Sequence, residues 1–478
     1  MSSIITSAFR FFQARTFINS FAYDTSENNI YLGLSKPTAW EEEYSPDTPS
    51  ESPRDNKSDW DEMIAMKKVV FSHIHSVIPR YDWQAGVVYA QWDDSDMDIW
   101  NRKFYVLTDA YNIYKCIYSP INSKGEHIPS TYCPASTQTS GTFKTDDGYI
   151  WKFMGRVENV DVPYLSNQWI PVKQITETDE SRQKYAQAAV QEQAIKGTVD
   201  SVIFKEGAVV TIGDITKNET TGELTKVSAN LKIEGDGSGA EVKAYAVLKS
   251  DNTVDRTKLN IVVTSNGTGY TWAELKSTNT SIINFGNNDA YVVCSPQCGH
   301  GGNIVEELGG FYTMITVNFV QEEDSNVTVE NDYRKLILIC NPTDGNGNLL
   351  TGSIYDLRTH LHYTEIADGI KGDSVVVHQG TEYSGTVIDI DRDTKMITLI
   401  NTTYNKNPQT GPYELNNTQA SGTSAVPTVI VDSVHKNPYS LTDTSVKKYS
   451  GQILYKDYRK VISRADDQTE QINIIFEF

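Results

Sequence analysis

The sequence predicts a mainly β, multidomain protein with a few helices and some α+β character. The chain has 478 residues, enough for roughly three domains. Short apolar runs with a period of two recur along it, separated by Gly, Asn, Thr and Asp clusters that favour turns. The last of these runs alternates Ile472, Ile474, Phe476 and Phe478 with Asn473, Ile475 and Glu477. We therefore expect the C-terminus to be docked in a sheet or against a partner.

The charge, the apolar runs and the cysteines of the sequence argue against several classes of protein, including nucleic-acid-binding, membrane-spanning and disulfide-rich secreted proteins. The formal net charge of -20 argues against a general phosphate-binding surface, so we expect no nucleic-acid partner. No apolar run approaches the ~20 residues of a membrane helix, which predicts no membrane insertion. Residues 4–21 contain Arg10 and Arg15 and no cleavage site, unlike a secretory signal. Five cysteines in a long chain argue against a disulfide framework and predict folding in a reducing cytoplasm.

The N-terminal part predicts two helices. In the first, Thr6 to Phe21, phenylalanines recur at spacings of three and four. A strand at Asn29 to Leu34 follows, and the polar segment from Glu41 to Ser58 predicts a surface loop. The second helix, Asp59 to Val77, is predicted from one apolar stripe and a stop before Pro79. The stripe consists of Met63, Met66, Val70, Ile74 and Val77.

Further along, antiparallel strands are predicted at Lys103 to Thr108, Tyr111 to Tyr118 and Tyr149 to Phe153. A third helix is expected from Thr178 to Lys196, ending at Gly197. β-sandwich or barrel-like modules are then inserted into a discontinuous scaffold. The expected parts are an N-terminal scaffold with two helices (1–175), a helix plus β-rich insertion with a glycine-turn repeat (176–308), scaffold strands (309–349), a second β-rich insertion (350–448) and a C-terminal scaffold strand (449–478).

The C-terminal stretch also carries a family resemblance. Its residues closely resemble the C-terminus of the dimeric baseplate wedge subunits of T-even-type contractile-tail phages. The first predicted helix, Gly310-Phe311 and four other segments resemble that family in matching order, and the resemblance extends over about half of the chain. The C-terminal positions are Ser450, Gly451, Tyr455, Arg459, Ile462, Asp467, Gln468, Thr469, Glu470, Ile472, Asn473, Ile474, Phe476 and Phe478. The other segments are residues 36–40, 77–83, 147–153 and 333–342.

The resemblance implies a structural, non-enzymatic subunit that needs no cofactor. It implies a homodimer that contacts other baseplate wedge proteins and tail-fibre or peripheral baseplate proteins around the tail hub. It also implies synthesis in the host bacterial cytoplasm, a place in the virion's tail baseplate, and rearrangement when the tail contracts. Two matching segments are expected to be structurally decisive, as interface or as core. They comprise Val77, Ile78, Pro79, Arg80, Asp82, Trp83, Asp467, Gln468, Thr469, Glu470, Ile472, Ile474, Phe476 and Phe478.

An alternative reading is a receptor-binding or polysaccharide-degrading tail protein whose Gly- and Tyr-rich insertions engage host surface glycans. The Gly235 to Ala240 loop is the richest glycine loop, but it opens onto a strand pattern and lacks the Lys-Ser/Thr pair of a phosphate loop. With the second glycine segment, Asn266 to Tyr270, it predicts hairpin turns that need positive φ.

Three patterns could bind metal, which would favour a third reading, a metal-dependent enzyme. Asp389, Asp391 and Asp393 have calcium-loop spacing, but Thr394 stands where the loop needs glycine, so a hairpin turn is preferred. Cys294, Cys298 and His300 supply only three of the four ligands of structural zinc. His360 and His362 share a strand face and are expected to be ordinary cross-strand histidines. We therefore predict no metal and no catalytic residues.

Overall fold

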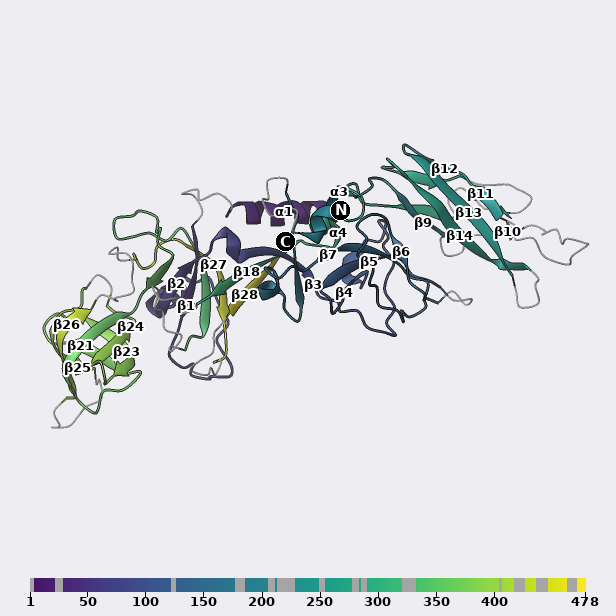
Figure 1. The fold of residues 1–478 in the computed structure, drawn as a ribbon. Coiled ribbons are helices and arrows are strands. Elements are labelled where there is room, and N and C mark those ends of the chain that lie inside the picture. Colours follow the sequence, from purple (N-terminus) through teal and green to yellow (C-terminus); the bar gives the residue numbers. More distant parts are fainter. Residues whose placement is uncertain are drawn as a thin grey trace, which may run out of the picture. The chain divides into compact units, whose positions relative to one another are not determined.

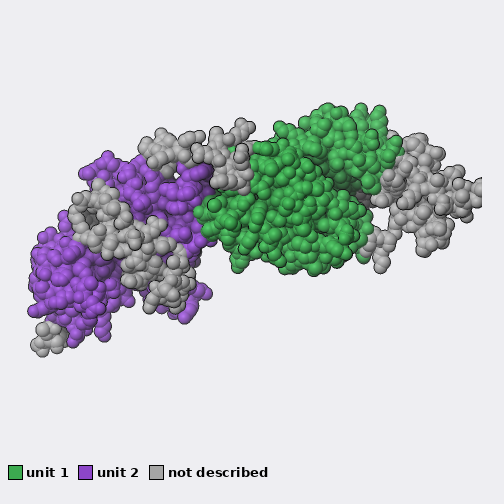
Figure 2. Space-filling view, viewed as in Figure 1, with its two compact units in different colours: residues 1–14, 75–313, 476–478 green, residues 15–74, 314–475 purple. Residues whose placement is uncertain are grey.

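A computed structural model of the protein describes most of the chain, and its mainly β, multidomain class confirms the prediction (Figure 1). Two compact units are each assembled from segments that lie far apart in sequence (Figure 2). Unit 1 comprises residues 1–14, 75–313 and 476–478, and unit 2 comprises residues 15–74 and 314–475. The described residues are 4–21, 29–121, 126–176, 185–204, 211–212, 228–248, 254–276, 283–284, 290–319, 332–403, 406–416, 426–435, 446–461 and 471–478.

Unit 2 is organised around a five-stranded antiparallel sheet with the order β20-β2-β1-β19-β27. Its strands are β1 (Ile30–Ser35), β2 (Met63–Lys68), β19 (Lys335–Cys340), β20 (Ile354–Asp356) and β27 (Gln452–Tyr458). The central strands β1 and β19 pair from Ile30 opposite Cys340 to Ser35 opposite Lys335. Both are buried along almost their whole length, because the sheet is covered on its two faces.

A closed six-stranded barrel forms the second part of unit 2, inside the predicted insertion 350–448. Its core consists of alternating side chains such as Leu361, Val376 and Ile397. The strands are β21 (Thr359–Ile366), β22 (Val375–His378), β23 (Ser384–Asp391), β24 (Met396–Ile400), β25 (Gly411–Leu415) and β26 (Thr428–His435). Strand β18 (Tyr312–Asn318) and the C-terminal strand β28 (Gln471–Glu477) are neighbours, and Thr316 Oγ1 lies 3.0 Å from Asn473 Oδ1.

Unit 1 has two packed parts. The first contains a four-stranded sheet of β4 (Tyr105–Leu107), β5 (Asn112–Tyr118), β7 (Ile150–Arg156) and β6 (Phe143–Lys144). It also contains the pair β3 (Ile74–Pro79) and β8 (Trp169–Val172), and the helices α3 (Ala186–Glu192) and α4 (Ile304–Glu307). Large aromatic side chains such as Trp151, Tyr114 and Phe104 fill its core.

The second part of unit 1 is the β-rich insertion. It has its own core around Val199, Val242 and Tyr270. The antiparallel pairs are β9 (Val199–Phe204) with β17 (Ala290–Cys294), β10 (Thr211–Ile212) with β16 (Ile283–Asn284), β12 (Ile233–Gly235) with β15 (Ala273–Leu275), and β13 (Ser238–Leu248) with both β11 (Ser228–Leu231) and β14 (Val254–Thr268). The insertion therefore folds around side chains that it supplies itself.

The predicted N-terminal helix is confirmed as α1 (Ser7–Asn19), and the strand at 29–34 is confirmed as β1. The C-terminal alternation is confirmed as β28. The strands predicted near residues 103–118 and 149–153 are confirmed as β4, β5 and β7. The predicted helix at 178–196 is only partly described: α3 covers Ala186–Glu192, and residues 177–184 lie outside the described part.

The predicted helix from Asp59 to Val77 is wrong. The helix in this region is α2 (Pro53–Asp61), which begins inside the predicted loop, with Ser52 as its N-cap. Strands β2 and β3 follow, separated by the 3-10 turn Phe71–His73. The residues Met63 to Met66 are all buried on β2, so both faces of the sheet are covered there. A continuous apolar run of this kind does not distinguish a buried strand from a helix.

The predicted glycine hairpin turns need a correction. Gly239, Gly267 and Gly269 have the predicted positive φ, but they lie along the paired strands β13 and β14 or directly after them. Ala240 is opposite Asn266, and a Cβ on Gly267 would lie 2.5 Å from the Ala240 nitrogen. These glycines therefore permit close approach of two backbones, which glycine also serves in strands.

A buried charge network joins three distant segments of unit 2. The carboxylate of Asp59, fully buried, lies 2.9 Å from Lys335 Nζ and 2.7 Å from Lys456 Nζ. Tyr458 donates its hydroxyl to Asp59 Oδ1 at 2.8 Å, and Lys335 also pairs with Glu62 at 2.9 Å. The end of α2 is thereby fixed to β19 and β27.

We expect Asp59→Ala to destabilise unit 2 by about 3–5 kcal/mol, because it leaves two buried lysines without this carboxylate. Urea unfolding followed by tryptophan fluorescence measures the loss, since Trp40 and Trp60 are buried in unit 2. The matched control is Lys406→Ala, which breaks an ion pair whose side chains are 37% and 89% exposed. We expect about 0–1 kcal/mol from the control. Equal effects of the two substitutions would contradict the importance of this network.

Candidate functional site

The segment from Val77 to Trp83 lies in the packed scaffold of unit 1. Val77 and Ile78 are fully buried on β3, which pairs with β8. Arg80 contacts Asp82 at 2.9 Å and donates to the Ser166 carbonyl at 2.7 Å. Trp83 Nε1 donates to Ser130 Oγ at 3.3 Å, and Pro79 is half-buried. In the isolated chain, this segment contributes to the core and to loop anchoring.

The C-terminal segment is also held in place. Ile472 and Ile474 are buried, whereas Phe476 and Phe478 are half-buried. In unit 1, Phe478 donates its backbone N–H to the Phe311 carbonyl at 3.2 Å. Arg10 pairs with Glu477 at 2.5 Å, donates to the Phe478 carbonyl, and covers the Phe311 ring at 3.4 Å. Asp467, Gln468, Thr469 and Glu470 lie outside the described residues.

Helix α1 buries one face and exposes apolar side chains beside it. Phe11 and Ala14 are buried, and the Phe11 ring contacts Trp100 and Phe311. An exposed group, which we call the N-terminal apolar surface, consists of Ile4, Ile5, Phe9 and Phe12, with exposed fractions of 70%, 70%, 49% and 54%. No Asp or Glu occurs in residues 4–21 of this strongly acidic chain. Exposed apolar groups of this kind mark interaction surfaces.

The candidate zinc ligands do not converge. Cys294 is buried, Cys298 is exposed, and the ring nitrogens of His300 contact Asp200 and Glu307. Asp391 accepts from the Asp393 and Thr394 backbone N–H groups at 2.9 and 3.1 Å, which makes it a turn residue between β23 and β24. Among the described residues, no group of three or more His, Cys, Asp or Glu side chains could hold a metal ion.

A buried cluster in unit 1 was missed by the sequence reasoning. Lys115 on β5, with a fully buried side chain, lies 2.7 Å from Glu307 Oε1 on α4. His300 Nδ1 is 2.8 Å from the same oxygen, and His300 Nε2 is 2.7 Å from Asp200 on β9. These residues are separated by up to 192 positions, so no spacing in the sequence could have indicated their contact.

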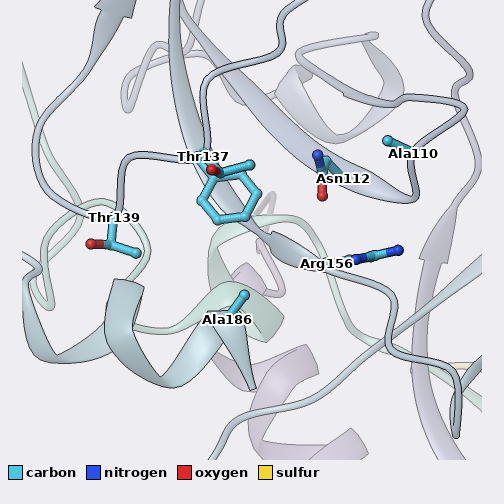
Figure 3. A pocket seen from close by; sticks show the side chains of 7 residues that line it. Ala110, Asn112, Thr137, Thr139, Arg156 and Ala186 are labelled. Carbon is cyan, nitrogen blue, oxygen red and sulfur yellow. The ribbon is translucent and has the colours of Figure 1, made fainter. Parts of the chain in front are cut away.

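One open pocket of about 350 Å³ lies beside β5, β7 and α3 (Figure 3). Its lining is mostly small and neutral, with Arg156 as the charged side chain. The lining residues are Ala110, Asn112, Thr137, Thr139, Phe153, Arg156 and Ala186. It contains no histidine, cysteine or carboxylate that could pair with a threonine for acid–base chemistry.

None of the described helices is long and apolar enough to cross a membrane.

The described units define a β-rich, multidomain protein in which further β modules are inserted between the segments of packed sheets. Residues 3–120 match the family described as Bacteriophage T4, Gp8. The chain is also 23% identical over 205 residues to the baseplate wedge protein gp8 of Enterobacteria phage T4. That match covers 36% of this chain and 60% of the relative. Both comparisons confirm the resemblance to wedge subunits, over part of each chain.

The two barrel histidines have separate partners. His360 on β21 contacts Thr398 on the neighbouring strand at 3.1 Å and Asp356 at 3.3 Å. His362 contacts Asp432 at 2.6 Å. Arg358 pairs with Asp356 at 2.6 Å. Burial acts to raise the pKa of Asp356, but hydrogen bonds from His360 and Arg358 outweigh it and lower the pKa to about 2.

We expect Asp356 to make unit 2 acid-sensitive. The folded pKa of the Asp356 carboxyl, about 2, lies below its unfolded pKa of about 3.9. The carboxylate therefore contributes fully to the stability of unit 2 at pH values above the unfolded pKa. The contribution, about 2 kcal/mol, is lost as pH falls towards the folded pKa. Thermal unfolding across this window measures it, and Asp356→Asn should be less stable near neutral pH but lose less on acidification. Parallel pH profiles of the two proteins would contradict this assignment.

Proposed function

We propose that this protein is a structural subunit of the baseplate wedge of a contractile phage tail, with no catalytic activity. The observation that carries the proposal is the match of residues 3–120 to the wedge family, supported by the similarity to a T4 baseplate wedge protein. The matched region contributes β1 and β2 to unit 2, and most of β3, with β4 and β5, to unit 1. The similarity therefore includes strands from the cores of both units.

The proposal extends to partners and location. The subunit is a homodimer in the virion's tail baseplate, made in the host cytoplasm. It contacts other wedge proteins and tail-fibre or peripheral baseplate proteins, and exchanges some contacts when the tail contracts. The segment from Val77 to Trp83 and the C-terminal strand contribute to this role through the core. Their described residues stabilise the scaffold that carries the contact surfaces.

The N-terminal apolar surface is the proposed site of contact with a second copy. A net charge of -20 makes contact between two acidic surfaces unfavourable, so self-association needs a patch without acids. Residues 4–14 of unit 1 supply such a patch, with Arg10 and no carboxylate side chain. A two-fold contact uses the same patch on both copies, and exposed phenylalanines are suitable anchors for it.

The molar mass of the purified chain, measured by light scattering across a dilution series, tests the dimer. We expect twice the chain mass of 53.5 kDa, with dissociation only at high dilution. A trimer would contradict the wedge assignment and favour a receptor-binding tail protein. A chain that stays monomeric at all concentrations would contradict the homodimer.

We expect Phe9→Asp to weaken self-association at least tenfold, because it places a charge in the N-terminal apolar surface. Phe9 is 49% exposed, so the substitution should leave folding intact, which circular dichroism checks. Met97→Asp is the matched control, since Met97 is a 75% exposed apolar residue outside that surface. Equal dimer dissociation constants for Phe9→Asp and the control would place the contact elsewhere.

A further inference from the structure

The buried cluster of Lys115, Glu307, His300 and Asp200 has the arrangement required to join a lysine to a carboxyl group. We propose that Lys115 Nζ and Glu307 Cδ form an intramolecular amide, an isopeptide bond, after the chain has folded. The bond would connect β5 to α4 across 192 positions of sequence. The proposal is independent of the wedge function, since it concerns the interior of unit 1.

The nucleophile and the carboxyl group already touch. Lys115 Nζ lies 2.7 Å from Glu307 Oε1, and their side chains are 0% and 1% exposed. The Trp92 ring lies 3.6 Å from the same nitrogen. Reacting groups that a protein holds in an attack orientation reach effective concentrations of roughly 10⁵–10⁸ M. Exclusion of solvent also protects the product from hydrolysis.

Each oxygen of Glu307 has a suitable partner for acyl transfer. The Gly301 backbone N–H donates to Oε2 at 2.6 Å, where negative charge would develop in a tetrahedral intermediate. His300 Nδ1 lies 2.8 Å from Oε1 and 3.2 Å from Lys115 Nζ, so it can exchange protons with both. Asp200 contacts the other ring nitrogen at 2.7 Å and orients the imidazole. Position 301 requires glycine, because its φ is 84° and a Cβ there would lie 2.3 Å from Val190 Cγ1.

The step balances without any further reagent. The ammonium of Lys115 loses one proton, and the neutral nitrogen attacks Glu307 Cδ to form the new C–N bond. A second proton leaves the nitrogen after attack, and His300 carries protons from nitrogen to Oε1. The Cδ–Oε1 bond then breaks, and Oε1 departs with both protons as water. The product is a neutral amide, which replaces a buried ion pair that is costly to desolvate.

The electrostatics of the cluster favour deprotonation of Lys115 and protonation of His300, and they oppose protonation of Glu307. Burial lowers the pKa of Lys115, which favours the neutral amine that the attack requires. Burial acts against charge on His300, but the Asp200 carboxylate outweighs it and raises the pKa of the imidazole. His300 can therefore hold the proton that Oε1 needs. Glu307 remains an anion until that proton arrives, because Lys115 and His300 outweigh the effect of burial and lower its pKa to about 2.

A second buried lysine–carboxylate pair provides an internal comparison. Lys335 Nζ lies 2.9 Å from Asp59 Oδ1 with side chains 5% and 0% exposed. Among the described residues, the polar side chains in contact with this pair are those of Glu62, Tyr458 and Lys456, and none of them is a histidine that could carry protons to the departing oxygen. We therefore expect this pair to remain ionic.

Intact mass spectrometry of the unfolded full-length chain tests the proposal. We expect the chain to be lighter than its sequence by the mass of one water molecule, and a protease digest to contain a branched peptide joining Lys115 to Glu307. Lys115→Arg and Glu307→Ala should each restore the full sequence mass. Lys152→Arg is the matched control and should keep the deficit, because Lys152 is also buried but donates to the Thr139 carbonyl at 2.6 Å.

Full sequence mass in the folded wild-type protein would overturn the proposal. A deficit that persists in Lys115→Arg would also overturn it, because dehydration at an Asp-Gly sequence such as Asp147-Gly148 loses the same mass. His300→Gln tests the proton carrier: we expect at least a hundredfold slower appearance of the lighter species in freshly synthesised chain, with unchanged circular dichroism. Formation at the wild-type rate in that variant would overturn the role of His300. A branched peptide joining Lys335 to Asp59 would overturn the requirement for a histidine.

Discussion

The pairing of β1 with β19 is the constraint on which unit 2 depends. It joins residues 30–35 to residues 335–340, and β2 and β27 add to its two sides. A sheet of this kind closes only after most of the chain has been made, so its local elements have little to pack against beforehand. The buried carboxylate of Asp59 then ties the end of α2 to lysines on β19 and β27. Packing and charge therefore fix the same distant segments together.

The inserted modules place different demands on the sequence. The barrel and the β9–β17 insertion each have a core formed by their own residues, around Leu361 and Val242 respectively. A module with its own core can change its surface without disturbing the sheet into which it is inserted. The family match ends at residue 120, before both modules. The physical independence of the insertions is consistent with a scaffold that keeps its sequence pattern while the insertions diverge.

Elements whose pattern is set by one exposed and one buried face could be predicted from sequence. The alternation of Ile472, Ile474 and Phe476 indicated β28. The phenylalanine spacing indicated α1, although Phe9 and Phe12 of that pattern are exposed and the helix buries Phe11 instead. The run around Met63 to Met66 was misassigned as a helix. Both faces of β2 are buried there, so its sequence does not show the alternation of apolar and polar residues that identifies a strand. His300 was singled out with the wrong neighbours. Its true partners, Asp200 and Glu307, depend on how the chain returns from an insertion of about a hundred residues, which local spacing does not record.

The position of the His300 cluster explains why so many charges are gathered there. Asp200 is on β9, at the start of the insertion, and His300 and Glu307 follow β17, where the chain leaves it. Lys115 belongs to β5, one of the two central strands of the sheet that receives the insertion. A purely apolar contact could slide, whereas the directional bonds of this cluster define one orientation of the insertion's two connecting strands on that sheet. The same requirement for a single geometry holds the Lys115 nitrogen 2.7 Å from a carboxylate oxygen of Glu307.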